Sequence, residues 1–310
     1  MQMNIESLAT EQPNARSREL DSLSAFELIN VMNEEDATVA QAVKEALPVI
    51  AVAVTHAAQA LRSGGRLIYV GSGTSGRMGM LDASECRPTF GVSQDTVVAV
   101  MAGGASAFAS AREGAEDDVE AGRQTIRDLA VTPNDLVVGI SASGRTPFTI
   151  AALAAAREIG AFTVGLSCNQ DALLSLQADA PIEVVTGSEV LTGSTRLKAG
   201  TAQKMVLNMI STGAMVLVGK VYKNYMVDMA MSNYKLQERA VDIVKHVLAV
   251  SEASARHSLE EAGGNIKVAI VMSKLGVRRE VAVNWLDSAG GSVRATLTAH
   301  SAEAGSAELP

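Results

Sequence analysis

The stretch that decides the fold runs from Leu67 to Pro88 and reads LIYVGSGTSGRMGMLDASECRP. Its β-branched and aromatic start predicts a buried strand over 67–70, which ends at alternating glycines. Glycines let the backbone approach a ligand closely, hydroxyls supply donors, and a following helix points its amide N–H groups at an anion. The stretch therefore predicts a phosphate-binding loop. Its predicted ligand contacts are Gly73, Thr74 and Ser75.

The same letters also fit the G-x-G-x-x-G pattern of dinucleotide-binding proteins. That class needs an acidic residue after the next strand, but the strand predicted at Thr96–Met101 ends in AGGAS. A P-loop is also disfavoured, because Arg77 stands where its lysine belongs and Met78 where its Ser or Thr belongs. A nucleotide is therefore a poorer candidate ligand than a sugar phosphate.

A second loop of the same kind follows another apolar run, in DLVVGI and SASGRTP over residues 135–147. Its hydroxyls could simply cap a helix that begins at Pro147. Two such loops at strand ends of one sheet favour a shared anion instead. The second loop is predicted to contribute Ser141, Ser143, Gly144 and Thr146.

Apolar runs alternate with helical patterns through the middle of the chain, which is typical of a doubly wound parallel sheet covered on both faces. Helices are predicted near 78–84, 106–128, 147–159 and 171–177, and a long one within 187–222. Ligands of such sheets bind at the carboxyl ends of the strands. The five predicted strands are 67–70, 96–101, 136–140, 162–167 and 182–185.

Three regions are predicted from the changes in pattern. Residues 1–62 form an N-terminal arm and helices, with a Ser24–Glu27 capping box and a break at Pro48. Residues 63–248 form the α/β domain. Residues 249–310 form a small helical domain of three pieces with a frayed tail, in which glycines separate the helices.

Composition excludes several classes of function. The 310 residues carry a net charge of −8 with only 3% aromatics, which leaves no basic surface or stacking platform for nucleic acid. No signal peptide and no apolar stretch of membrane-spanning length is evident, so a cytoplasmic protein is expected. The two cysteines and four histidines show no ligand spacing, so neither disulfide, metal nor cofactor is expected.

The helix around 205–218 is apolar on nearly every side, which predicts burial in a core or in a subunit interface. A homodimer with active sites near the interface follows as an expectation. Lys198 and Lys204 on this helix could reach a substrate, although a helix lysine is more often solvated or extended toward solvent.

Taken together, several motifs resemble those of the N-acetylmuramic acid 6-phosphate etherase family, whose core resembles the sugar isomerase (SIS) domain. The motifs are TEQPN, GSGTSGRMGMLDASECRPTFG, REGAEDD, SASGRTP, GSTRLKAGTAQKMVLNM and NYMVDM. The match runs in order over roughly residues 9–295. One departure is Arg87, where the family has proline in its ECPPT run, and the C-terminal helices resemble a ubiquitin-associated tail.

The resemblance implies a carbon–oxygen lyase that removes the lactyl ether at carbon 3 of N-acetylmuramic acid 6-phosphate during cell-wall sugar recycling. Opening the sugar to its aldehyde acidifies the proton on carbon 2, so elimination of lactate followed by hydration needs a base and an acid but no metal. By position in the motifs, Glu85 resembles the proton donor and Glu116 the second acid/base residue.

Alternatives accompany these assignments. From the residues alone, the acidic cluster around Glu116 is more readily a solvated helix face, and Glu85 could only complement a helix dipole. A sugar-phosphate aldose–ketose isomerase would use the same loops without a lactyl pocket. A non-catalytic sugar-phosphate sensor would keep the loops and be indifferent to both acids.

Overall fold

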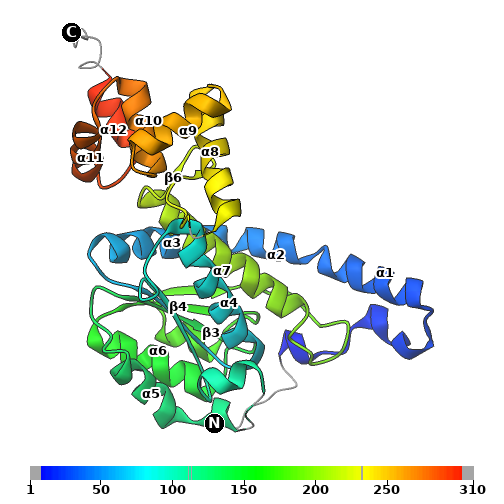
Figure 1. Cartoon of the computed structure of the whole chain (residues 1–310). Helices are drawn as coiled ribbons and strands as arrows, with labels where there is room; N and C mark the ends of the chain where they lie inside the picture. The colour runs from blue at the N-terminus through cyan, green and yellow to red at the C-terminus, as the bar shows by residue number, and fades with distance from the viewer. Residues whose placement is uncertain (1–7, 111, 113, 232, 302–310) are drawn as a thin grey trace. The chain divides into compact units, whose positions relative to one another are not determined.

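The computed structural model describes residues 8–110, 112, 114–231 and 233–301. It divides into two compact units, the first made of residues up to 84 with 94–213, and the second of 85–93 with residues from 214 onward. The first unit holds a sheet covered by helices, and the second is mainly helical (Figure 1). The three-region division predicted from sequence, with boundaries at 62 and 248, stays a prediction about folding domains.

The sheet of the first unit has five parallel strands in the order β2-β1-β3-β4-β5. The doubly wound parallel fold predicted from the alternating pattern is therefore confirmed. Each strand lies within two residues of its predicted position, and β1 and β3 pair in a register that ends at Gly71 opposite Ile140. The strands are β1 Leu67–Gly71, β2 Val97–Met101, β3 Leu136–Ile140, β4 Phe162–Ser167 and β5 Ala180–Glu183.

The N-terminal helices begin and end where local chemistry requires. Helix α1 (Ala25–Asp36) starts with the predicted capping box, in which Ser24 and Glu27 each satisfy the other's backbone N–H. The chain breaks at Ala46 between α2 (Val39–Glu45) and α3 (Leu47–Arg62), and Pro48 lies in the first turn of α3, where a proline is tolerated.

Helices cover both faces of the sheet. The side chains of Ile68 and Val70 pack in one buried cluster with α5 (Val119–Asp128) and α6 (Pro147–Ile159). Tyr69 points to the opposite face, as the strand period requires, and donates a hydrogen bond of 2.7 Å to Asp82. Asp82 lies on α4 (Gly73–Phe90) and also accepts a bond from Ser211 on α7 (Lys198–Leu217), so α4 and α7 cover that face.

Several predicted helix limits were wrong. Helix α4 begins at Gly73, so the predicted loop forms the first turn of a helix that continues past Arg87 and Pro88 to Phe90. The helix predicted over 106–128 is α helix only from Val119, because left-handed Gly114 interrupts it and Asp118 caps the new start. Residues 173–177 form a 3-10 helix, and α7 begins at Lys198 rather than near 187.

The second unit builds its own core, around Val244, Ala269 and Ile270. In its described residues it contains a short antiparallel pair, β6 and β7, and the helices α8 to α12, besides the ends of α4 and α7. Between Ser251 and residue 301 there are four helices rather than the predicted three, because each of the three glycine breaks ends one helix. The elements are β6 Val221–Tyr222, β7 Tyr225–Met226, α8 Tyr234–Leu248, α9 Glu252–Glu261, α10 Ile266–Leu275, α11 Arg279–Ser288 and α12 Val293–His300. The predicted frayed tail, residues 302–310, lies outside the described residues.

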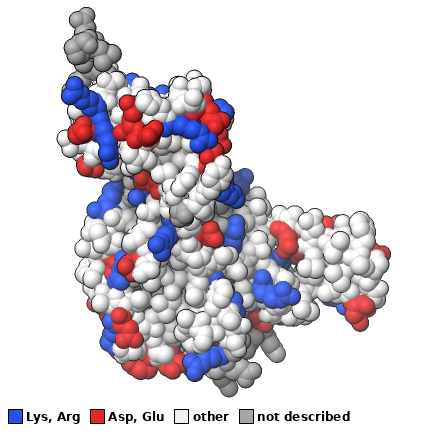
Figure 2. All heavy atoms as spheres, viewed as in Figure 1, with Lys and Arg blue, Asp and Glu red and all other residues white. Residues whose placement is uncertain are grey.

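Basic and acidic side chains are interspersed on the face drawn in Figure 2, without a large area of either sign. Within the described ranges no single helix is both long and apolar enough to cross a bilayer. One pair of consecutive segments, Ala25–Glu45 and Leu47–Arg62, is long and apolar enough when the two are taken together. The pair is bent by 64° at its break, and length and composition are the only properties it shares with a membrane span.

Candidate functional site

The strand order places the two hydroxyl-rich loops side by side. In the order β2-β1-β3-β4-β5, the chain reverses its direction of winding between β1 and β3. The carboxyl ends of these two strands carry the loops at 72–76 and 141–146. A reversal of this kind leaves a crevice beyond the strand ends, where α/β proteins bind ligands.

The first loop is a tight passage from β1 into α4. A Cβ on Gly76 would lie 2.9 Å from the carbonyl oxygen of Gly71 and 2.7 Å from the Cβ of Met101, so only glycine fits. The N–H groups at the start of α4 therefore lie directly beyond the strand. The Ser72 side chain is buried, with 8% of its surface exposed. Its Oγ nevertheless has no hydrogen-bond partner within the described structure.

The second loop is held by its own side chains. Ser141 Oγ lies 2.8 Å from Thr146 Oγ1 and accepts a 3.0 Å bond from the N–H of Gly144. Ser143 Oγ accepts a 3.2 Å bond from the N–H of Arg145. Gly144 has a φ of +66°, and an added Cβ would lie 2.4 Å from that of Ala172. These contacts hold the second loop in its shape within the protein itself.

A cavity of about 310 Å³ joins the two loops. Six of the residues predicted to form the site line it, while Ser141 and Gly144 shape the loop behind them. The acid Glu116 reaches this cavity from the segment after β2. The predicted residues in the lining are Gly73, Thr74, Ser75, Glu116, Ser143 and Thr146.

Glu116 belongs to a 3-10 turn, Ala115–Asp117, rather than to the solvated face of an α helix. Gly114 precedes it with a φ of +76°, and the side chain of Asp118 then caps α5. Glu116 is exposed, which leaves its carboxylate accessible to a ligand in the cavity. Glu116 therefore does not lie on an α helix, and its part in the site stays a prediction.

Several lining residues had not been predicted, among them Glu11, Arg145 and Thr195. Arg145 lines the cavity, and its buried Nε has no hydrogen-bond partner among the described residues. Glu11 comes from the N-terminal segment and Thr195 from the loop before α7. These three residues lie far from one another along the chain. The one feature of the sequence that could have pointed to them is that they belong to the TEQPN, SASGRTP and GSTR motifs.

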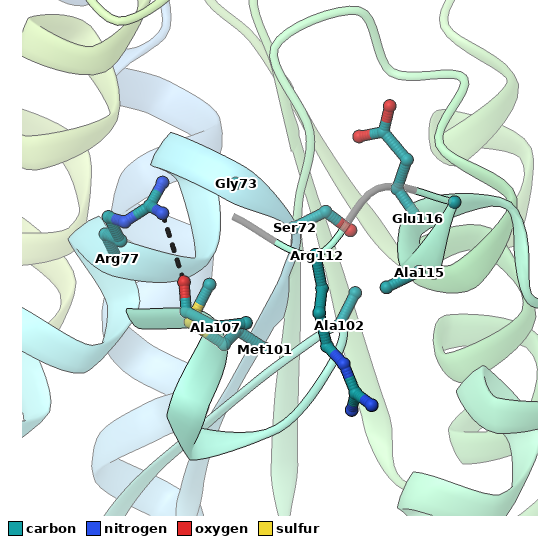
Figure 3. A pocket seen from close by; sticks show the side chains of 10 residues that line it. Ser72, Gly73, Arg77, Met101, Ala102, Ala107, Arg112, Ala115 and Glu116 are labelled. Carbon is teal, nitrogen blue, oxygen red and sulfur yellow. Dashed lines mark hydrogen bonds between the residues drawn. The ribbon is translucent and has the colours of Figure 1, made fainter. Parts of the chain in front are cut away.

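A second cavity, of about 200 Å³, shares Ser72, Gly73 and Glu116 with the first. It adds the guanidinium groups of Arg77 and Arg112, together with a wall of small apolar side chains. Figure 3 shows Arg77 beside Ala107, whereas Arg112 extends past Ala102 and away from the carboxylate of Glu116. The rest of its lining is Met101, Ala102, Ala107, Gly114 and Ala115.

Glu85 lies exposed on α4, in the segment that the contacts group with the second unit. Its pairing with Glu116 in one active site stays a prediction. Lys198 is instead a structural residue, because its buried Nζ donates a 2.7 Å bond to the carboxylate of Glu35. Lys204 is exposed on the same helix.

The ion pair at Glu35 is firmly maintained. Burial raises the pKa of this carboxyl, but hydrogen bonds from Lys198 and Asn14 and the charges of Lys198 and Arg16 lower it overall. Both cysteines are buried thiols, and burial raises the pKa of Cys168 to about 12. In the described part of the chain, no group of three His, Cys, Asp or Glu side chains could hold a metal ion.

Two family models match parts of the chain. The N-terminal SIS domain of glucokinase regulatory protein matches residues 49–157, and the C-terminal lid domain of that protein matches residues 223–274. The first match covers β1, β2, β3 and both hydroxyl-rich loops. It supports the assignment of the sheet to the SIS class.

Curated relatives match almost the whole chain. The N-acetylmuramic acid 6-phosphate etherase of Halalkalibacterium halodurans is 51% identical over 290 residues, which cover 94% of this chain and 97% of the relative. The same enzyme of Bacillus subtilis is 48% identical over 291 residues, covering 94% and 96%. A solved phosphoheptose isomerase from Neisseria gonorrhoeae is more distant, with a TM-score of 0.44, 18% identity and coverage of 60% and 99%. That likeness is too weak to support an argument.

Proposed function

The chain belongs to the N-acetylmuramic acid 6-phosphate etherase family, and we propose that it removes the D-lactyl ether from this sugar phosphate. The products are N-acetylglucosamine 6-phosphate and D-lactate. The proposed reaction is that of a carbon–oxygen lyase in amino-sugar catabolism. The substrate derives from peptidoglycan. We propose that it is recycled in the cytoplasm and that this enzyme acts there.

One observation carries the proposal: a single cavity gathers hydroxyls from both loops, the buried Nε of Arg145 and the carboxylate of Glu116. Hydroxyl, guanidinium and helix N-terminal N–H groups are the donors that phosphate oxygens bind. We assign the 6-phosphate to Ser75, Ser143 and Thr146, with Ser141 holding the second loop in shape. The sugar carbons then extend toward Glu116.

The reaction proceeds on the open-chain aldehyde. A base removes the proton from carbon 2, the bond between carbon 3 and the ether oxygen breaks, and the departing lactate receives a proton from an acid. Water then adds to carbon 3 of the resulting enal, and carbon 2 regains a proton. We assign Glu116 as the base and Glu85 as the donor to lactate, because each lies in the corresponding family motif.

We also propose a homodimer. Helix α7 buries Val206, Leu207 and Ile210 within the chain, so it offers less free apolar surface than its sequence suggested. Helix α1 instead leaves Phe26 74% exposed and Ile29 58% exposed, one turn apart on the same face. Exposed apolar side chains so arranged are typical of protein interfaces. Sedimentation of the purified protein at micromolar concentration tests this, and a stable monomer would contradict it.

The activity is tested by incubating the purified protein with N-acetylmuramic acid 6-phosphate and measuring D-lactate. Glu116→Gln should lower kcat by roughly 10²–10⁴-fold with little change in KM, because it removes a general base without emptying the cavity. Glu120→Gln is the matched control, since Glu120 is an exposed acid of the same run whose carboxylate pairs with Arg127. A sensor protein would release no lactate, and an isomerase would form a ketose phosphate instead.

Isotopes distinguish the route. In heavy water, deuterium should enter carbon 2, and oxygen from labelled water should appear on carbon 3 of the product sugar. If the labelled oxygen appeared in lactate, the enzyme would be displacing at the lactyl carbon. The assignment of Glu85 and Glu116 to an elimination would then be wrong.

A further inference from the structure

The cavity lined by Arg77 and Arg112 is not used by the phosphate assignment proposed above. We propose that it binds the carboxylate and methyl group of the D-lactyl substituent, and that Arg112 is the residue that recognises this carboxylate. The inference rests on the proposed etherase function and deepens it. It assigns a leaving-group site separate from the hydroxyl-lined cavity.

The placement of the two cavities supports this division. They share Ser72, Gly73 and Glu116, so Glu116 borders both. A substrate with its phosphate among the hydroxyls of one cavity can therefore extend past Glu116 into the other. The carbon–oxygen bond that breaks must lie near the acid/base group, with the sugar phosphate on one side and the leaving group on the other.

The charges of the second cavity match an anion. Arg77 donates to the carbonyl oxygens of Phe108 at 2.9 Å and Ala107 at 3.0 Å, and Arg112 donates to that of Gly103 at a long 3.4 Å. These partners are neutral. Counting only residues that the structure describes, neither guanidinium forms an ion pair. Two positive charges thus border a cavity in whose described lining Glu116 is the one acid, and Glu116 is bonded to neither of them among the described residues.

An orphaned hydroxyl gives a second, independent indication of a ligand. Ser72 lines both cavities, is 8% exposed, and its Oγ has no partner in the described structure. Leaving a buried hydroxyl unbonded is unfavourable unless a ligand supplies the missing partner. Its position on the shared border suits the ether oxygen or the carboxylate of a group that passes from one cavity into the other.

The remaining walls distinguish the substituents of the sugar. The lactyl group is a carboxylate with a methyl branch, whereas the N-acetyl group has a methyl but no charge. Small apolar side chains suit either methyl group, but two guanidiniums that form no ion pair with a described residue favour only the charged substituent. The apolar wall consists of Met101, Ala102, Ala107 and Ala115.

The two arginines have different roles. Arg77 donates two hydrogen bonds to backbone carbonyls of the 3-10 turn Ala105–Phe108 and so holds that turn in place. Arg77 is therefore a positioning residue for the cavity wall. Arg112 is exposed, and the bond it makes to a described residue is a long one to a carbonyl, so its guanidinium can turn to a carboxylate at small energetic cost. Arg112 is therefore the residue to test.

The test compares two reactions of one site. Release of D-lactate uses the lactyl site, whereas exchange of labelled solvent oxygen into carbon 3 of N-acetylglucosamine 6-phosphate uses the same loops and acids without a lactyl group. Arg112→Ala should lower kcat/KM for lactate release by about 10- to 100-fold, as expected for a lost charged hydrogen bond, and the exchange rate by at most about threefold. Arg112→Lys should recover part of the loss. Arg123→Ala, which removes an exposed arginine paired with Glu158, should change neither rate.

A second substrate separates charge recognition from a structural effect. The same sugar phosphate with its lactyl carboxylate converted to the amide should react about 10- to 100-fold more slowly than the acid with the unaltered protein. With Arg112→Ala, the acid and amide should react at nearly equal rates. Equal loss of lactate release and oxygen exchange, or a persistent preference for the acid in the variant, would overturn the assignment. If the unaltered protein released no lactate, the proposed function itself would be wrong.

Discussion

The two ends of the same pair of strands, β1 and β3, differ in how completely their polar groups are bonded. At the amino ends, Asp135 is 2% exposed and accepts bonds from the backbone and guanidinium of Arg66 and from Thr132. At the carboxyl ends, Ser72 Oγ and Arg145 Nε are buried without partners among the described residues. The buried polar groups named at the amino ends have hydrogen-bond partners, whereas those named at the carboxyl ends lack them in the part of the chain that the structure describes.

This difference separates structure from function within one sheet. A saturated buried network stabilises the fold, because every group lost from water has a replacement partner. Unpaired groups reduce stability and are retained where a ligand completes them. Substitutions at the amino ends should therefore affect stability, and those at the carboxyl ends should affect substrate use.

The largest effect is expected at the amino ends. Asp135→Ala should reduce the free energy of unfolding by about 3–5 kcal/mol, because it leaves Arg66 and two backbone N–H groups without their acceptor. Denaturant unfolding measures this, with Arg123→Ala as a surface control that should lose at most about 1 kcal/mol. A loss equal to that of the control would show that the network is not needed.

At the carboxyl ends, Ser143→Ala should weaken substrate use. We expect kcat/KM for N-acetylmuramic acid 6-phosphate to fall about 10- to 100-fold, because a hydroxyl bond to the phosphate is lost. The free energy of unfolding should change by less than about 1 kcal/mol. Ser288→Ala, at an exposed serine of α11, serves as the control. Equal processing of the dephosphorylated sugar would mean that the loops have another ligand.

A smaller pair of effects compares the two loops directly. Ser72→Ala removes an unpartnered hydroxyl, so the protein should be unchanged in stability or more stable by up to about 1 kcal/mol, while kcat/KM falls about tenfold. Ser141→Ala removes the acceptor of the Gly144 N–H and should lower stability by about 1 kcal/mol. Thermal unfolding and D-lactate release measure the two quantities. Destabilisation by Ser72→Ala would show that its hydroxyl has a structural partner.

The smallest expected effect is on how the free energy of unfolding depends on pH, and it is seen only in acid. Burial raises the pKa of Asp135, but bonds from Arg66 and Thr132 and the charge of Arg66 lower it overall, below its ordinary value of 3.8. A lowered folded-state pKa stabilises the fold above the unfolded pKa and ceases to do so as pH falls through the folded one. Unfolding measured from pH 5 downward should therefore show a loss of stability below about pH 3.8 that Asp135→Asn reduces. An unchanged acid profile in that variant would contradict this assignment.

Local pattern was sufficient for the elements that carry the site. Continuous apolar runs ending in Gly and Ser marked β1 and β3, and the Ser24–Glu27 capping box marked the start of α1. Each depends on neighbours within a few residues, where strand period and capping chemistry act. Limits of helices were predicted less well, as at Val119 and Lys198, because left-handed glycines and tertiary caps ended or delayed them.

The sequence by itself determined a parallel α/β sheet and, through its motifs, the family, and it predicted the two hydroxyl-rich loops and the candidate acids of the site. Only the tertiary structure brought Glu11 and Thr195 to the hydroxyl-lined cavity, and Arg112 to the adjoining one. The physical reason is that strand order decides which loops become neighbours, and this order depends on packing between segments far apart in the chain. Whether a polar group is left unpartnered is decided by the same packing, since it depends on every residue that surrounds that group.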